Sequence, residues 1–331
     1  MTAFVTGGSG FIGGAIIRRL LAEGREVRAL ARSDAAAEVV AATGARPVLG
    51  DLLARERLAE AIRGCDVVFH AAGISRLCPR STSDLDATNV DGAEAVVHAA
   101  AEAGASRVVH TSSAATIGER AGAVGREDSA HRGSFLSPYE RSKYLAERRV
   151  LEAGRAAGID VICVNPSSVQ GPGRTEGTAR ILIRLAGART AALIATWISL
   201  VDIDDCAEGH IRAERLGLPG ERYVLSGATI STRSAVALLR EQTGRPTRVV
   251  WLPRWAVRAA MPLTAVAPRT ARSEDPPICP ASIRTLLHGH RYDGSRATRD
   301  LGLVYRPIEE TLARTLAWYE ERGILRPSAR A

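Results

Sequence analysis

The chain has 331 residues, of which 46% are hydrophobic and 24% are charged, a balance typical of a globular protein with a large core. Its formal net charge is +8, but the arginines are spread along the whole chain and aromatic residues make up only 4%, which argues against nucleic-acid binding. No run of about 18 uncharged apolar residues is present, so we expect no membrane-spanning helix and no stable membrane insertion. The first residues do not have the pattern of a secretion signal.

The cysteines form no CxxC pair and no His/Cys cluster with the spacing of metal ligands. Scattered cysteines of this kind are typical of reduced thiols in the cytoplasm. We therefore expect a cytoplasmic protein without a bound metal. The five positions are Cys65, Cys78, Cys163, Cys206 and Cys279.

The N-terminal segment predicts a strand, a glycine-rich turn and a helix. Residues 2–6 form a short apolar run, the turn Gly7-Gly8-Ser9-Gly10-Phe11-Ile12-Gly13 follows, and an amphipathic pattern extends to about residue 24. Glycines at this spacing permit a tight turn and close approach of the backbone to a pyrophosphate, and the helix N-terminus offers free amides to the anion. Because the motif stands between a strand and a helix, it predicts a dinucleotide-binding site.

Strands and helices continue to alternate up to about residue 166. Further strands are expected at residues 26–31, 46–49, 66–70, 107–111 and 160–165, and helices at 84–104 and 139–157 and between the second and third strands. The alternation predicts an α/β protein, namely a Rossmann doubly wound parallel sheet with helices on both faces. The ligand is expected at the carboxyl ends of the strands.

After residue 166 this rhythm is lost, and Gly/Pro-rich stretches predict a smaller, discontinuous substrate lobe. We expect residues 1–166 and 200–225 to form the dinucleotide-binding domain and residues 167–199 and 226–331 to form the lobe. The loop at 119–136, which contains His131 and Phe135, is expected to shape the substrate pocket.

The second strand ends at Arg32, where an acidic residue would hold the adenosine ribose of NAD. A guanidinium can instead bind a 2′-phosphate through two parallel charge-assisted bonds, so the sequence favours NADP. Asp34 follows two residues later and could face the ribose, which keeps NAD open, or could cap the next helix.

Lys143 is the only lysine of the chain, and it follows Tyr139 by four residues. Residues at this spacing share a helix face, so the two side chains can meet. An ammonium about 4 to 5 Å away would lower the pKa of the phenol from near 10 toward neutrality, as acid–base catalysis requires. The strand at 107–111 ends in Thr111-Ser112-Ser113, which could supply a second hydrogen bond to a carbonyl oxygen.

Taken together, these motifs resemble those of the extended short-chain dehydrogenases/reductases over essentially the full length. The resemblance rests on the glycine turn, Gly50-Asp51-Leu52, His70-Ala71-Ala72-Gly73, Asn89-Val90-Asp91-Gly92, Thr111-Ser112-Ser113, Tyr139 to Lys143, and Asn165-Pro166. It implies a catalytic triad of Ser113, Tyr139 and Lys143, with Lys143 also bonding the nicotinamide ribose. Asn89 resembles a residue that supports a proton relay, although an asparagine satisfied by the backbone is an equal interpretation.

The resemblance also implies a set of cofactor contacts. Asp51 would contact the adenine amino group, Ala71 and Ala72 the adenosine, and Pro166 with Ser168 the nicotinamide end. The complete cofactor set is Gly7, Ser9, Gly10, Phe11, Ile12, Gly13, Arg32, Asp51, Leu52, Ala71, Ala72, Gly73, Thr111, Tyr139, Lys143, Pro166 and Ser168.

Within the family, residues 200–210, 220–227 and 252–255 are most similar to the dihydroflavonol-reductase and 3β-hydroxysteroid-dehydrogenase branch. Sugar-nucleotide epimerases and dehydratases of the family carry an arginine just before the stretch that begins here at Asp202. In this chain the run Trp197-Ile198-Ser199-Leu200 has no cation to meet a sugar diphosphate.

We therefore expect an NADP(H)-dependent oxidoreductase that interconverts a carbonyl and an alcohol on a small, apolar metabolite. Residues that could line an apolar pocket, or equally form ordinary lobe core, are Trp251, Leu252, Trp255, Val257 and Met261. The alternatives are an NAD-dependent nucleotide-sugar epimerase or dehydratase and a non-catalytic dinucleotide sensor. The helices at 84–104 and 139–157 resemble the pair that forms homodimers in relatives, and the segment 251–269 could act as a lid or touch an anionic membrane.

Overall fold

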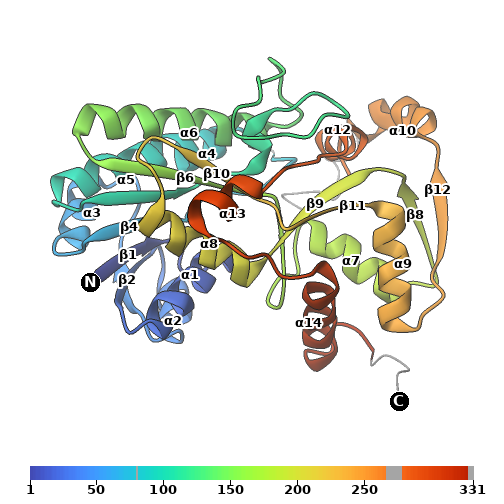
Figure 1. The fold of residues 1–331 in the computed structure, drawn as a ribbon, viewed down its shortest axis with the longest axis horizontal. Coiled ribbons are helices and arrows are strands. Elements are labelled where there is room, and N and C mark those ends of the chain that lie inside the picture. Colours follow the sequence, from blue (N-terminus) through green and yellow to red (C-terminus); the bar gives the residue numbers. More distant parts are fainter. Residues whose placement is uncertain (80, 266–277, 327–331) are drawn as a thin grey trace.

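The computed structural model describes residues 1–79, 81–265 and 278–326 (Figure 1). Within them, seven parallel strands form the main sheet, in the order β10-β6-β5-β4-β1-β2-β3. The strands are β1 (Thr2–Thr6), β2 (Glu26–Ala31), β3 (Arg46–Leu49), β4 (Val67–His70), β5 (Arg107–Thr111), β6 (Asp160–Pro166) and β10 (Arg222–Leu225). The predicted parallel sheet is confirmed.

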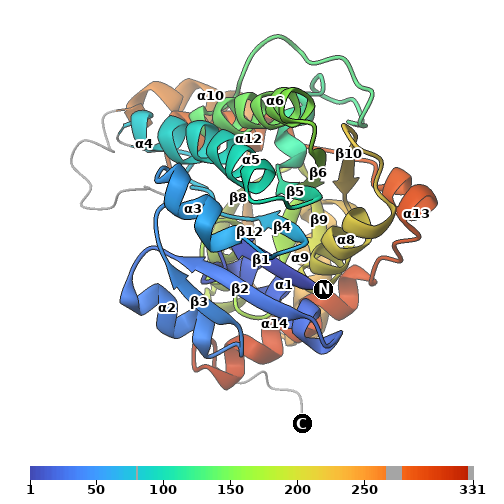
Figure 2. The same cartoon turned by 90° about the vertical axis from the view of Figure 1, so that its left-hand side faces the viewer.

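Helices cover both faces of this sheet, as Figure 2 shows. One face carries α3 (Arg55–Ile62), α5 (Gly92–Glu102) and α6 (Pro138–Ala157); the other carries α1 (Phe11–Ala22), α2 (Asp34–Ala41) and α8 (Ile203–Leu216). Successive strand residues enter opposite cores because side chains alternate across a strand. In β1, Phe4 packs with α3 and α5, whereas Val5 packs with α1 and α8. The predicted Rossmann fold is therefore confirmed.

The helix expected at residues 84–104 is not continuous. It consists of α4 (Ser83–Leu85), a π-helical stretch η1 (Asp86–Asp91) and α5. The π-helical stretch contains Asn89, and such stretches are frequent at functional sites. Periodicity alone could not reveal this change, because the π-helical stretch is only six residues long.

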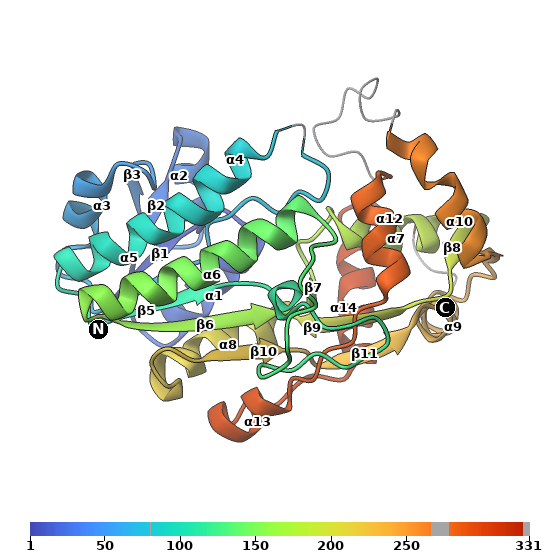
Figure 3. The same cartoon turned by 90° about the horizontal axis from the view of Figure 1, so that it is seen from above.

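The smaller lobe lies beyond the carboxyl ends of the main strands, at the right of Figure 1 and in the view from above in Figure 3. It contains the three-stranded sheet β11-β9-β7 and the parallel pair β12-β8. Its strands are β7 (Ser168–Gln170), β8 (Thr190–Ile194), β9 (Trp197–Asp202), β11 (Ala228–Ser231) and β12 (Arg248–Leu252). Its helices are α7 (Thr178–Gly187), α9 (Thr232–Thr243), α10 (Arg254–Ala260), η3 (Met261–Ala265), α12 (Pro280–His288) and α14 (Ile308–Glu321).

One helix from the C-terminal region packs on the main domain. Ala297 and Leu301 of α13 (Ser295–Leu301) belong to the core between the sheet, α1 and α8. We propose that residues 1–166 and 200–225 form the dinucleotide-binding domain and that residues 167–199 and 226–331 form the lobe. The one change is that α13 is assigned to the dinucleotide-binding domain, because it packs there. No helix of the described chain is long and apolar enough to cross a bilayer.

Candidate active site

The turn between β1 and α1 is so closely packed that side chains would not fit at two of its glycines. Gly7 has a φ of +72°, and a Cβ added there would lie 2.6 Å from the amide nitrogen of Ala72. A Cβ on Gly13 would lie 2.1 Å from the carbonyl oxygen of Gly7. The first turn of α1 has no acidic residue, and its N-cap Gly10 makes no side-chain hydrogen bond. The turn therefore fits a pyrophosphate held by free backbone amides.

The segment after β4 lies directly against this turn. The amide of Ala71 donates to the carbonyl of Thr6 at 3.2 Å, and the amide of Ala72 donates to the Thr6 hydroxyl at 3.2 Å. A Cβ added to Gly73 would lie 3.1 Å from Asn89 Oδ1 and 3.9 Å from Lys143 Nζ. The glycine turn, the loop after β4 and the predicted lysine therefore meet at the carboxyl edge of the sheet.

The remaining predicted cofactor residues lie around the same edge. Arg32 is exposed just after β2 and forms no ion pair within the described chain, so its guanidinium is available. Ser33, rather than Asp34, is the N-cap of α2. Six more of the predicted cofactor-binding residues are exposed or half-buried near strand ends or helix starts, namely Ser9, Phe11, Ile12, Asp51, Leu52 and Ser168.

Lys143 is buried, and its ammonium donates to the carbonyl oxygen of Thr111 at 2.7 Å. Burial lowers the pKa of Lys143 to about 8, although the charge of Glu147 opposes that shift. Glu147 is also buried, and its carboxylate accepts hydrogen bonds from Arg222, Thr116 and Asn165. The ammonium of the only lysine is therefore buried and hydrogen-bonded to the protein backbone.

The two serines after β5 have different partners. Ser112 is buried and donates to Glu147 Oε2 at 2.5 Å. Ser113 is the N-cap of the 3-10 helix η2 (Ala114–Ile117); its hydroxyl accepts from the amide of Ala115 at 3.3 Å and lies near enough to Tyr139 to lower the pKa of the phenol. Ser113 is therefore the serine that can share a substrate oxygen with the phenol, as the resemblance implies.

Tyr139 does not titrate as the sequence predicts. Burial has the largest influence and raises the pKa of its phenol above the ordinary value, while Ser113, Arg174 and Ser75 oppose this shift. Lys143 is not among the groups that lower it. The prediction that the ammonium acidifies the phenol is therefore wrong for the protein without its cofactor, because Lys143 is directed to Thr111.

Asn89 bonds both the neighbouring loop and α6 with its side-chain amide. Its Oδ1 accepts from the amide of Ile74 at 2.7 Å, and its Nδ2 donates to the Ile74 carbonyl at 3.0 Å and to Ser142 Oγ at 2.9 Å. Of the two interpretations open from the sequence, the geometry supports an asparagine satisfied by backbone, which positions the loop after β4.

Comparison with known proteins decides the family. Residues 3–226 match the model of the NAD dependent epimerase/dehydratase family. The chain belongs to this family. The membership in the extended short-chain dehydrogenases/reductases that the sequence predicts is thereby confirmed. A protein from Synechocystis sp. named as a dihydroflavonol 4-reductase is 32% identical, with 98% of this chain and 96% of that protein covered.

Two further relatives of this epimerase/dehydratase-family chain bear on its chemistry. The 4-hydroxy-2-methyl-3-oxo-4-farnesyl-3,4-dihydroquinoline-1-oxide ketoreductase of Stigmatella aurantiaca is 36% identical, with 78% of each chain covered. DesIV, a dTDP-glucose 4,6-dehydratase from Streptomyces venezuelae solved with NAD and TYD bound, has a TM-score of 0.78 and 26% identity, with 98% of this chain and 99% of that chain covered. The family includes reductases and dehydratases, so membership identifies a nicotinamide-dependent enzyme, and the site must decide the reaction.

Arg174 is a site residue that the sequence did not reveal. It follows β7, its guanidinium lies 5.7 Å from the ring centre of Phe11, and its Nη1 donates to the carbonyl of Val169 at 2.6 Å. Its charge acts on Tyr139, so it lies between the glycine turn and the phenol. No sequence rule predicts a contact between three segments this far apart along the chain.

Three buried histidines behind the site were also missed. His70 bonds Thr6 Oγ1 at 2.7 Å, and His210 bonds Thr111 Oγ1 at 2.9 Å. Burial lowers the pKa of His70 to about 3, of His210 to about 4, and of His110 well below its ordinary value. These rings are therefore neutral near pH 7 and add no second positive charge around Lys143.

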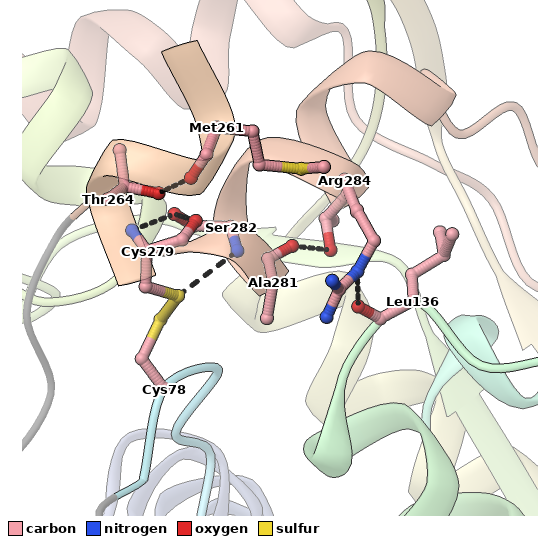
Figure 4. The surroundings of a disulfide bond; sticks show 9 residues. Cys78, Leu136, Met261, Thr264, Cys279, Ala281, Ser282 and Arg284 are labelled. Carbon is pink, nitrogen blue, oxygen red and sulfur yellow. Dashed lines mark hydrogen bonds between the residues drawn. A yellow bond between two sulfur atoms is a disulfide. The ribbon is translucent and has the colours of Figure 1, made fainter. Parts of the chain in front are cut away.

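The expectation of five reduced cysteines is wrong for two of them. Cys78, in the loop after β4, and Cys279, the N-cap of α12, form a disulfide that joins the two domains (Figure 4). The three free cysteines, Cys65, Cys163 and Cys206, are buried. The pairing could not be predicted from spacing, because the two sulfurs are 201 residues apart along the chain.

The substrate lobe does have cations near Trp197, which corrects the expectation drawn from residues 197–200. The Arg291 guanidinium lies 4.5 Å from the ring centre of Trp197, and Arg291 lines a cavity of about 470 Å³ together with Arg233 and Arg254. None of the three arginines forms an ion pair within the described chain. An anionic group could therefore be met here by arginines from other segments.

The predicted apolar wall is divided among several environments. Trp251 packs on the lobe core, and Val257 and Met261 pack beside Ile283 and neighbouring residues. Leu252 and Trp255 are exposed, the latter by 75%. The first three are therefore lobe core, which was one of the two interpretations. Residues 266–269 of the proposed lid or membrane segment lie outside the described residues.

The loop at 119–136 is largely exposed, but some of its residues contact both domains. His131, Phe135 and Tyr144 of α6 form an aromatic cluster with ring centres 4.6 to 5.4 Å apart. Glu119 is buried; burial raises its pKa, but hydrogen bonds from His288 and His290 outweigh this and hold it at about 2. Through Glu119 the loop thus connects the segment after Ser113 to the end of α12.

Proposed function

We propose that this protein is an NADP(H)-dependent oxidoreductase that interconverts a carbonyl and an alcohol through Ser113, Tyr139 and Lys143. The observation that carries the proposal is the buried Lys143, which bonds the Thr111 carbonyl and lies near Gly73 beside the glycine turn, on the same helix as Tyr139, whose pKa Ser113 acts to lower. A dinucleotide sensor without catalytic activity would not need this arrangement.

The bound nicotinamide supplies or accepts the hydride. Tyr139 donates the proton to the carbonyl oxygen, and its raised pKa keeps that proton in place near neutrality. Ser113 holds the developing oxyanion with its hydroxyl. Lys143 places a positive charge next to Gly73 and Thr111, where a ribose hydroxyl of the dinucleotide would lie. The backbone around Gly7 and Gly13 is too close for a side chain at either position, so no side chain would project from these positions toward a bound pyrophosphate.

A panel of ketones and aldehydes, followed by NADPH absorbance, tests the proposal. Tyr139→Phe should reduce kcat by about 10²- to 10⁴-fold, the usual contribution of an acid–base group, without weakening NADPH binding. Tyr144→Phe is the matched control, because Tyr144 lies on the same helix but faces His131 and Phe135. A fully active Tyr139→Phe enzyme would refute the mechanism.

The preference for NADP over NAD is supported by Arg32, whose exposed guanidinium has no ion-pair partner within the described chain. Asp34 lies in the first turn of α2, where its charge favours the helix N-terminus. Structural neighbours bind NAD, so the test is a direct comparison of KM for NADPH and NADH. A lower KM for NADH would reverse the assignment.

The second candidate is a nucleotide-sugar epimerase or dehydratase that keeps NAD bound. The arginines of the 470 Å³ cavity favour it, since guanidinium groups bind diphosphates well, and DesIV is a structural neighbour. Incubation with UDP- and dTDP-sugars separates the two: conversion of the sugar without net NADPH consumption supports this candidate and excludes the first.

A small, apolar carbonyl compound is the proposed substrate, supported by the farnesylated ketone in the name of the Stigmatella relative. We also propose a homodimer through α5 and α6, for which light scattering should give about twice the 35.1 kDa chain mass. A cytoplasmic location is supported by the three free cysteines and opposed by the disulfide.

A further inference from the structure

One carboxylate and two imidazoles converge away from the catalytic residues. Glu119, in the loop that follows η2, meets His288 at the end of α12 and His290 two residues later. Glu119 Oε1 lies 3.2 Å from His288 Nε2 and 2.7 Å from His290 Nδ1. One ligand atom from each residue lies within 4.8 Å of the others. From this we propose a binding site for a divalent transition-metal ion of the zinc class, formed by Glu119, His288 and His290.

The local backbone explains why two histidines can act together. The chain leaves the helix through Gly289, which has a φ of +75°, and reaches an isolated bridge at Tyr292. The rings of His288 and His290 lie 4.8 Å apart, so both side chains project to the same side and reach one carboxylate. A His-x-His pair with a carboxylate from a distant segment is a donor set that suits zinc.

The distances also fit a metal ion. Zinc bonds to nitrogen and oxygen of about 2.0 to 2.1 Å place tetrahedral ligand atoms about 3.3 Å apart. The two Glu119 contacts, 2.7 and 3.2 Å, are near this value, and the two histidine nitrogens lie within 4.8 Å of each other, so binding requires a modest rearrangement of the cluster. The ion would take the place of the contacts that His290 Nδ1 now makes with Glu119 Oε1 at 2.7 Å and with the Tyr292 hydroxyl at 2.8 Å, and binding would release any proton held there to solvent.

A second, independent observation is the other oxygen of the same carboxylate. Glu119 is 2% exposed, and its Oε2 is buried without any hydrogen-bond partner. A buried carboxylate oxygen without a donor is costly, and a metal ion on the carboxylate would satisfy it. The hydrogen bonds to Oε1 therefore do not fully account for the burial of this side chain.

The site has access to solvent and a defined electrostatic setting. His288 lines the cavity of about 470 Å³, through which an ion and its water ligands could enter. The nearest guanidinium, Arg132, is paired with Glu140, and Arg291 lies over Trp197. These neighbouring positive charges reduce affinity, so we expect binding by zinc rather than by weakly held calcium or magnesium.

The ion would fasten α12 at its C-terminal end. At its N-terminal end this helix is already tied by the Cys78–Cys279 disulfide, and Arg284 Nε donates to the Leu136 carbonyl at 3.0 Å (Figure 4). The metal would connect the loop that follows Ser113 to the substrate lobe. The inference does not depend on the proposed oxidoreductase reaction.

The test uses the full-length protein without an affinity tag, stripped with EDTA and then titrated with Zn²⁺ alone in competition with a chromophoric chelator. We expect one equivalent per chain, a rise in unfolding temperature of about 4 °C at a hundredfold excess over Kd, and loss of about 100-fold or more in affinity in Glu119→Gln and His288→Gln. His98→Gln, on α5, is the matched control and should bind like the wild type.

Co²⁺ on the wild-type protein keeps the proposal testable if the variants do not fold. An intense visible spectrum typical of four-coordinate cobalt, without a thiolate charge-transfer band, supports the site. Absence of saturable binding, a thiolate band, or unchanged affinity in folded Glu119→Gln and His288→Gln proteins would overturn it. Neither substrate nor NADPH is present, so these results are separate from any failure of the proposed reaction.

Discussion

Replacing Lys143 by methionine should remove catalysis and at the same time stabilise the folded protein. Burial lowers the pKa of Lys143 from 10.5 to about 8, and this difference corresponds to about 3.4 kcal/mol that the folded state loses when the lysine is charged. Methionine has no charge to bury, but it leaves the Thr111 carbonyl without its donor, which costs about 1 kcal/mol. The expected net gain at pH 7 is about 2 kcal/mol.

The pH dependence gives this prediction its sign. The folded protein releases the Lys143 proton at a lower pH than the unfolded chain, so the penalty is complete below pH 8 and disappears as the pH rises toward 10.5. The advantage of the methionine variant should therefore shrink by about 2 kcal/mol between pH 7 and pH 9.5.

Urea unfolding at these two pH values measures the effect. Arg148→Met is the matched control, because Arg148 lies on the same helix with a side chain 62% exposed and should show little change. A Lys143→Met protein that is less stable than the wild type at pH 7, or whose stability difference is the same at pH 9.5, would refute the reasoning about the buried ammonium.

Three further predictions concern the cofactor site and the disulfide. Arg32→Ala should raise KM for NADPH about tenfold or more and leave KM for NADH unchanged, as initial rates with each nucleotide will show. Cys279→Ser should lower the free energy of unfolding by about 2 to 4 kcal/mol without reductant and should then be insensitive to dithiothreitol, whereas Cys65→Ser keeps the disulfide and should lose stability in dithiothreitol as the wild type does. Gly13→Ala should abolish nucleotide binding measured by fluorescence titration, because the new Cβ would lie 2.1 Å from the Gly7 carbonyl oxygen.

The dinucleotide-binding domain could be predicted because each of its signals is local. The apolar run at residues 2–6, the glycine turn and the amphipathic helix are adjacent in sequence and become β1, the turn and α1. The same holds for Tyr139 and Lys143, whose spacing of four on one helix was visible from the sequence, as was the strand that ends at Thr111.

The contacts that the sequence could not reveal connect segments far apart along the chain. Arg174 approaches Tyr139 only because the chain after β7 returns over the glycine turn, and Glu119 meets His290 across 171 residues. The orientation of Lys143 was missed for a similar reason, since the Thr111 carbonyl at the end of β5 captures its ammonium. Spacing along one helix defines a shared face but not the partner on that face.

The electrostatics of the site bear on the direction of the proposed reaction, that is, on carbonyl reduction compared with alcohol oxidation. Two opposing effects act on the pKa of the Tyr139 phenol: burial raises it, while Ser113, Arg174 and Ser75 lower it. Because burial prevails, the phenol keeps its proton in the cofactor-free protein, which is the state required to protonate a carbonyl oxygen. In the proposed mechanism the oxidation of an alcohol would need the phenolate, and among the described residues the charge of Arg174 lowers the pKa of the phenol. In the proposed reaction, the positive ring of an oxidised nicotinamide would add further stabilisation to the phenolate.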